Sequence, residues 1–200
     1  MKALALSLSP LIAVGSAAAA TVSVSSYNYL SSPNSSYPDS TGSELTDGVD
    51  QTIAWSSGAT ITASDVRPLV GWLNRNPSVQ FNFGSFQLID SVTVWIADSD
   101  NAAGVGLPNS VTVRTPDNSL SRTFTIDMPI DPTVSGTTVP IILDQLAFTT
   151  DTLIVEASRN SQWTMFSEVQ FSDTSAVPEP STSILLTGLL GSVLLFRRRG

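Results

Sequence analysis

Residues 77–97, PSVQFNFGSFQLIDSVTVWIA, decide the fold. Apolar and polar residues alternate through 77–83, and 86–97 is rich in β-branched and aromatic residues. Alternation with a period of two places one side of a strand against a core and the other side toward solvent. Gly84 and Ser85 separate the two runs and predict a turn. The stretch therefore predicts two consecutive strands.

Runs of the same type continue along the chain, separated by segments rich in Gly, Pro, Asn and Asp. A short strand is predicted at 21–26, and the later runs are residues 110–115, 122–128, 138–143, 152–157 and 163–171. No convincing soluble amphipathic helix interrupts them. The pattern predicts an all-β protein, a jelly-roll β-sandwich of about eight strands.

A polar segment follows the first predicted strand. Residues 27–43 are rich in Ser, Pro, Asn and Gly, which predicts a long loop, and the segment contains three tyrosines. We expect Tyr27, Tyr29 or Tyr37 to hold this loop against the body, with a ligand-binding role as the alternative.

The N-terminus is typical of a secretory signal peptide. Residues 1–20 contain one basic residue, Lys2, then an apolar stretch and a run of alanines, which predicts cleavage after Ala20. The signal implies export, and it leaves residues 21–176 as a single domain.

The C-terminal segment 177–200 has three consecutive parts. A Pro178-Glu179-Pro180 motif is followed by an apolar run, 184–196, and by Arg197, Arg198 and Arg199. As a helix the run spans roughly 20 Å of a hydrocarbon core of ~30 Å, so it predicts a marginal transmembrane anchor. The arginines would stay on the cytoplasmic side, with the body outside.

This order of parts resembles the PEP-CTERM sorting signal of Gram-negative bacteria. The resemblance implies processing by an exosortase, a membrane enzyme that recognises the Pro-Glu-Pro element and removes the tail. The precursor would be anchored transiently in the inner membrane and then reach the outer surface or the extracellular space. An ordinary short anchor after two prolines is the alternative.

Composition excludes several chemistries. The chain has no His and no Cys, so it contains neither a Ser-His-Asp system nor the usual zinc, haem or iron–sulfur ligands. Its formal charge of -8 disfavours nucleic acid and favours neutral ligands or divalent cations. Carboxylate pairs could hydrolyse glycosides, but spacing alone does not identify such a pair, so we expect no enzyme.

An Asp-Gly turn is the most informative motif of the body. Asp47, Asp50 and Thr52 crowd oxygen atoms into a tight turn, which suits a hard cation such as calcium. An ordinary turn before a strand is the alternative.

The body also resembles a known family. The segments LTDG at 45–48, VGWLNRNPSVQFNFGSFQLIDSVTVWI at 70–96 and WTMFSEVQF at 163–171 are similar to discoidin (coagulation factor 5/8 C-type) domains. These belong to the galactose-binding-like superfamily, which includes many bacterial carbohydrate-binding modules. The resemblance implies one structural Ca²⁺ held by Asp47, Asp50, Thr52 and Glu168. A solvated position for Glu168 is the alternative.

Ligand binding in this family uses loops at one end of the sandwich, where an aromatic ring stacks on a sugar and Arg or Asn bonds its hydroxyls. The resemblance therefore nominates Trp72, Asn74, Arg75, Arg159 and Asn160. Trp72 lies between apolar residues and belongs equally well to the core, where we also expect Trp95.

These observations predict an exported, non-catalytic protein that binds polysaccharide at the cell surface or in the extracellular matrix. The alternative is a structural matrix or biofilm protein without a specific small ligand.

Overall fold

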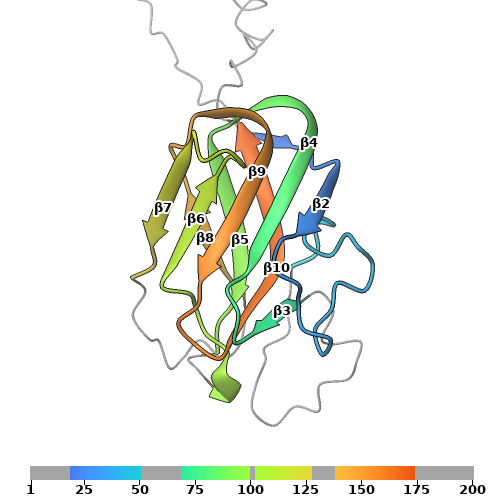
Figure 1. The fold of residues 1–200 in the computed structure, drawn as a ribbon, viewed down its shortest axis with the longest axis vertical. Helices are drawn as coiled ribbons and strands as arrows, with labels where there is room; N and C mark the ends of the chain where they lie inside the picture. Colours follow the sequence, from blue (N-terminus) through green and yellow to red (C-terminus); the bar gives the residue numbers. More distant parts are fainter. Residues whose placement is uncertain (1–18, 51–68, 100–101, 128–137, 174–200) are drawn as a thin grey trace, which may run out of the picture.

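The computed structural model describes residues 19–50, 69–99, 102–127 and 138–173, which form two packed antiparallel sheets (Figure 1). The described ranges contain one short 3-10 turn, Ala102–Gly104, and no helix with the length and apolar character to cross a bilayer. The predicted C-terminal sorting signal, and all of the predicted signal peptide but its last two residues, lie outside these ranges.

The first sheet, sheet A, is built around the last strand. Strand β10 (Trp163–Asp173) lies between β5 (Ser91–Ala97) and two short strands that share its other edge, and β8 (Thr138–Leu143) completes the sheet beyond β5. The short strands are β1 (Ala20–Val22) and β3 (Val70–Leu73), which pair with opposite ends of β10. Between them, the N–H of Val169 donates to the carbonyl of Leu45 at 2.8 Å.

The second sheet, sheet B, has the strand order β2-β4-β9-β6-β7. Its strands are β2 (Ser26–Tyr29), β4 (Ser78–Ile89), β9 (Phe148–Ser158), β6 (Ser110–Arg114) and β7 (Ser121–Thr125). The described ranges therefore hold ten strands in an all-β sandwich, which confirms the predicted fold class.

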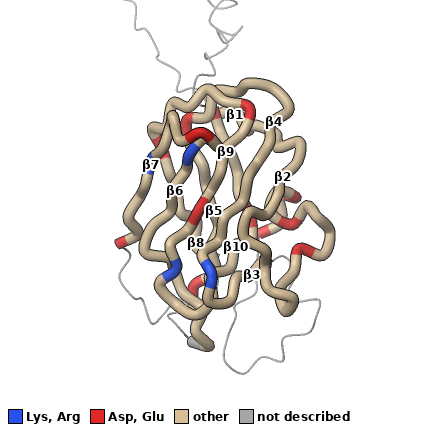
Figure 2. Tube along the Cα trace, in the orientation of Figure 1, with Lys and Arg blue, Asp and Glu red and all other residues tan. Residues whose placement is uncertain are grey.

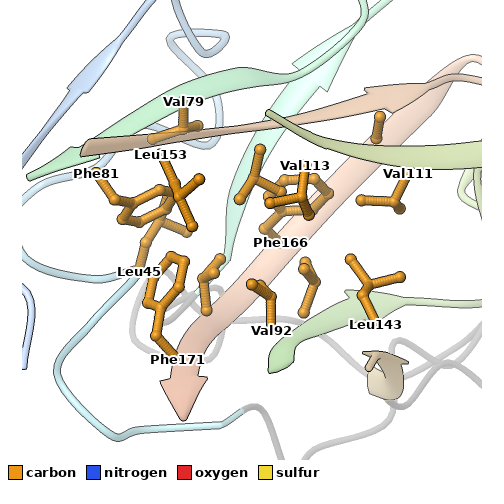
Figure 3. Packing of buried hydrophobic residues seen from close by; sticks show 14 of the residues in the cluster. Leu45, Val79, Phe81, Val92, Val111, Val113, Leu143, Leu153, Phe166 and Phe171 are labelled. Carbon is orange, nitrogen blue, oxygen red and sulfur yellow. The ribbon is translucent and has the colours of Figure 1, made fainter. Parts of the chain in front are cut away.

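The core fills the space between the two sheets, as the alternating patterns predict (Figure 3). Phe81 of β4 and Phe171 of β10 face each other across the sandwich with ring centroids 5.0 Å apart. Leu45 packs beside them from the loop, and it is completely buried. This side chain closes the edge of the core between β1 and β3.

Three local predictions are corrected. Gly84 does not end a strand: β4 continues through it with a register shift, and its φ of 77° fits a bulge. The first part of the predicted loop 27–43 is strand β2. Trp95 lies outside both core clusters, because its neighbours Val94 and Ile96 point inward and the alternation turns Trp95 outward.

Candidate functional site

Two loops at the lower end of the sandwich in Figure 1 bring four of the predicted ligand-binding residues together. Asn74 and Arg75 lie on the β3–β4 turn, and Arg159 and Asn160 lie on the β9–β10 loop; all four are exposed. The N–H of Asn74 donates to the carbonyl of Gln162 at 2.8 Å, which ties the two loops together. We call this region the loop end.

The local sequence explains why these loops hold their shape. Asn74 has a φ of 53°, a left-handed conformation that Asn tolerates better than most residues. The N–H of Arg159 donates to Oδ1 of Asn76 at 3.2 Å, and Nδ2 of Asn109 donates to the carbonyl of Arg159 at 3.3 Å. Asparagine side chains thus join three separate loops.

The described ends of the chain lie away from the loop end. Ala20 pairs with Asp173, whereas Leu73, beside the loop end, pairs with Trp163 at the other end of β10. The loop end and the pair of Ala20 with Asp173 therefore lie at opposite ends of this strand.

Positive charge is scarce in the described ranges, and part of it lies at the loop end (Figure 2). The guanidinium of Arg75 makes no hydrogen bond or ion pair with the described part of the chain, whereas Arg114 forms a bidentate pair with Glu156 at 2.7 and 3.1 Å. The Arg159 guanidinium donates to the Ser161 carbonyl at 3.4 Å. Arginine side chains at this end are thus available to a ligand.

Trp72 has no role as a sugar platform, because its side chain is 0% exposed. Its ring packs against Phe166 and Tyr29 with centroids 5.2 and 5.9 Å apart. Its Nε1 donates to the carbonyl of Ser31 at 2.7 Å. The core alternative therefore holds for Trp72, which supports the loop that begins at Leu30.

That loop contributes residues which the sequence analysis did not nominate. A pocket of about 390 Å³ lies between residues 32–35 and residues 73–75. Its lining consists of Ser32, Pro33, Asn34, Ser35, Leu73, Asn74 and Arg75. The polar composition of residues 27–43 is the only signal for this pocket in the sequence, which favours a packing role for the loop over a ligand-binding role.

The three tyrosines do hold the loop, as predicted. The hydroxyls of Tyr27 and Tyr29 both donate to Oδ2 of Asp39, at 2.5 and 2.7 Å. The other oxygen, Oδ1, accepts the N–H of Gly42 at 2.7 Å. Farther along, the ring of Tyr37 meets that of Trp163 edge-on at 5.1 Å. We call Tyr27, Tyr29 and Asp39 the Asp39 clamp.

The clamp carboxylate is held in its charged form. Burial by itself raises the pKa of Asp39, but hydrogen bonds from the two tyrosine hydroxyls and two backbone N–H groups outweigh it and hold this pKa below the usual value. Burial and the bonds to Asp39 raise the pKa of both tyrosines. Both hydroxyls therefore remain donors at physiological pH.

The Asp-Gly turn lies against Glu168, as the resemblance implies. The N–H of Gly48 donates to Oε2 of Glu168 at 3.2 Å, and Glu168 is only 3% exposed. Burial raises the pKa of Glu168 to about 7; the charges of Asp47 and Asp50 raise it further, while the Gly48 bond opposes them. A buried carboxylate thus faces two others.

The chemistry of this donor set fits calcium in part. Carboxylate and turn carbonyl oxygens are suitable ligands, and a cation would relieve the repulsion on Glu168. However, Asp47 Oδ1 accepts the N–H of Val49 at 2.9 Å and Asp50 Oδ1 accepts the Thr138 hydroxyl at 2.5 Å. No cluster of three carboxylates in the described ranges has metal-binding geometry. Thr52 lies outside these ranges.

No protein-family model matches the sequence, and no curated protein does. Solved structures are similar to it in fold. A mutant of the lectin binding domain of Lectinolysin complexed with Lewis b matches at 10% identity and a TM-score of 0.51, covering 78% of this chain and 97% of that one. A fucose binding module from Streptococcus pneumoniae matches at 10% identity and a TM-score of 0.50, covering 76% and 96%. At such identities the likeness shows a shared β-sandwich fold.

Proposed function

We propose that this chain is an exported, non-catalytic protein that binds polysaccharide through its loop end. One observation carries the proposal: Asn74, Arg75, Arg159 and Asn160 come from two separate loops and meet, exposed, at the end of the sandwich away from both described chain ends. Amide and guanidinium groups donate hydrogen bonds well to sugar hydroxyls.

The fold supports this proposal. The similar solved structures include a lectin domain complexed with Lewis b and a fucose binding module. This chain lacks histidine altogether, so its loop end would recognise a sugar with Asn, Arg and Ser side chains.

The tail supports a proposal about sorting. The order of the Pro178-Glu179-Pro180 motif, the apolar run and the three terminal arginines supports an exosortase as processing partner. A transient inner-membrane anchor would hold the precursor, and tail removal would deliver the body to the outer surface or the extracellular space.

Calcium remains a proposal for the turn at Asp47 and Asp50 with Glu168. Carboxylate oxygens are hard ligands, but the three side chains do not converge in this structure. An ion would have to draw them together, and main-chain carbonyls of the turn or Thr52 would complete the shell. Bound there, the ion would neutralise Glu168 and tie the loop to β10. Its role would be structural, because the turn is not among the residues of the loop end.

A glycan panel tests the binding proposal. The full chain, purified in a detergent without a sugar headgroup, is applied to neutral and acidic glycans with and without calcium. Saturable binding that is weakened in the double variant Asn74→Ala/Arg159→Ala supports the loop end. Absence of binding to every glycan contradicts the proposal and favours a structural matrix or biofilm protein.

A further inference from the structure

The lining of the pocket between residues 32–35 and 73–75 indicates which class of sugar the loop end would bind. This inference rests on the proposed function of the loop end. We propose that the pocket binds a uronic acid unit of an acidic polysaccharide, with Arg75 bound to the carboxylate of the sugar. Its volume of about 390 Å³ lies in the range of small-ligand sites.

The walls of the pocket are fixed before any ligand arrives. The N–H of Asn34 donates to the carbonyl of Gly71 at 2.7 Å, and the Trp72 Nε1 holds the carbonyl of Ser31. On the other side, the bond from Asn74 to Gln162 holds the turn. Because one wall is bonded to β3 and the other to the β9–β10 loop, binding requires little ordering of the pocket.

The lining selects for hydrogen bonding over stacking. It contains two serines, two asparagines and one arginine, with Pro33 and Leu73 as its apolar members. No aromatic ring is among these residues, so a neutral sugar gains no stacking surface here. Hydroxyls of a sugar ring would pair with the serine and asparagine side chains.

The charge of the lining selects for an anion. Arg75 is its sole charged residue, and the Arg75 guanidinium has no partner in the described part of the chain. A guanidinium offers a planar fork of donors that matches a carboxylate in a bidentate pair. The same positive charge disfavours amino sugars.

The acidic character of the whole chain does not oppose this pairing. The body without its signal peptide and tail is more acidic than the full chain, whose formal charge is -8, but the pocket lining contains no Asp or Glu. At physiological ionic strength, charges more than about 8 Å apart are largely screened. A contact pair within the pocket is screened much less.

Calorimetry with matched sugars tests the proposal on the full chain. An oligomer of galacturonic acid is compared with the neutral oligomer of galactose, which differs in carrying a hydroxymethyl group in place of each carboxylate. We expect the acidic oligomer to bind about tenfold more tightly, and Arg75→Gln to remove that preference. Arg75→Lys keeps the positive charge but cannot make the bidentate hydrogen bond, so it should retain part of the preference for the acidic oligomer.

Arg122 provides the matched control. It is also exposed, but it lies on β7, and Arg122→Gln should leave both affinities unchanged. Unfolding midpoints equal to that of the unmodified chain establish that the variants fold.

Several outcomes would overturn the inference. Equal affinity for the two oligomers, or no effect of Arg75→Gln, overturns the acidic specificity and leaves polysaccharide binding intact. Tighter binding of a sulfated galactose oligomer overturns the carboxylate assignment. Binding of neither oligomer, with other glycans bound in the panel, overturns the inference alone; failure of the whole panel overturns the proposed function as well.

Discussion

Replacing Tyr29 by Phe tests whether the Asp39 clamp stabilises the loop that forms one wall of the pocket. The change removes one hydrogen bond of 2.7 Å to a charged acceptor and leaves the ring in place. Such bonds contribute about 1.5–3 kcal/mol. Asp39 still accepts hydrogen bonds from the Tyr27 hydroxyl and the Gly42 N–H in this variant. We therefore expect the free energy of unfolding to fall by ~1.5 kcal/mol, the lower end of that range.

Asp39→Asn removes the negative charge of the group to which both hydroxyls donate hydrogen bonds. We expect it to lower the free energy of unfolding by about 2 kcal/mol at pH 7. The pKa of Asp39 is lowered in the folded protein from an ordinary value of 3.8. A lowered carboxyl pKa stabilises the fold above the ordinary value and ceases to do so as the pH falls through the folded value. The difference between the unmodified chain and Asp39→Asn should therefore shrink at pH 3.

Urea unfolding of the full chain, followed by tryptophan fluorescence, measures these free energies. The double variant Tyr29→Phe/Asp39→Asn should lose about 1 kcal/mol less than the sum of the single losses, since the two groups share one bond. Additive losses, or a loss below about 0.5 kcal/mol for Tyr29→Phe, would show that the Tyr29–Asp39 hydrogen bond does not stabilise the fold.

Three further predictions concern the turn, the core and the tail. With a chelator present, Glu168→Gln should raise the unfolding midpoint, because it removes a buried charge that is repelled by two carboxylates. With calcium added, only the unmodified chain should gain stability. A thermal scan in which calcium does not stabilise the unmodified chain would contradict the proposed calcium site. Trp72→Phe should lower the free energy of unfolding by about 2 kcal/mol, because it removes a hydrogen bond and leaves a cavity. It should weaken glycan binding only as far as it loosens the loop. Unchanged stability with abolished binding would contradict the core role of Trp72. Mass spectrometry of the exported protein should find a C-terminus near residues 178–180, whereas a form that retains Arg199 would refute processing.

The strands were predictable where alternation is strict. The alternating run SVTVRT at residues 110–115 is predicted as a strand, and residues 110–114 form β6. Gly84 was misjudged because a glycine at positive φ serves a turn and a bulge equally well. The choice between them depends on β9, whose pairing with β4 resumes beyond the bulge. That pairing is a distant contact, which the local sequence does not contain.

The site was predictable only in part for the same reason. Trp72 and Trp95 both stand among apolar residues. Local alternation turns Trp95 outward, whereas the strand of Trp72 is buried along its first three residues and only its pairing with β10 shows that it belongs to the core. The placement of Arg75 and Arg159 at one end of the sandwich followed from the resemblance and from no local pattern. Residues 32–35 were missed because their place beside the β3–β4 turn depends on bonds to Gly71 and Trp72, far along the chain.

The pairing of β1 with β10 has a consequence for how the protein reaches its folded state. The first described strand pairs only with the last, from Ala20↔Asp173 to Val22↔Phe171. Contacts between such distant residues form slowly, because closing the long intervening chain costs conformational entropy before any stabilising contact is made. The sandwich therefore cannot be completed before nearly the whole body has been synthesised. If the chain is exported as proposed, sheet A closes only after β10 has crossed the membrane. Until then the edges of β1 and β5 that pair with β10 lie open to other chains.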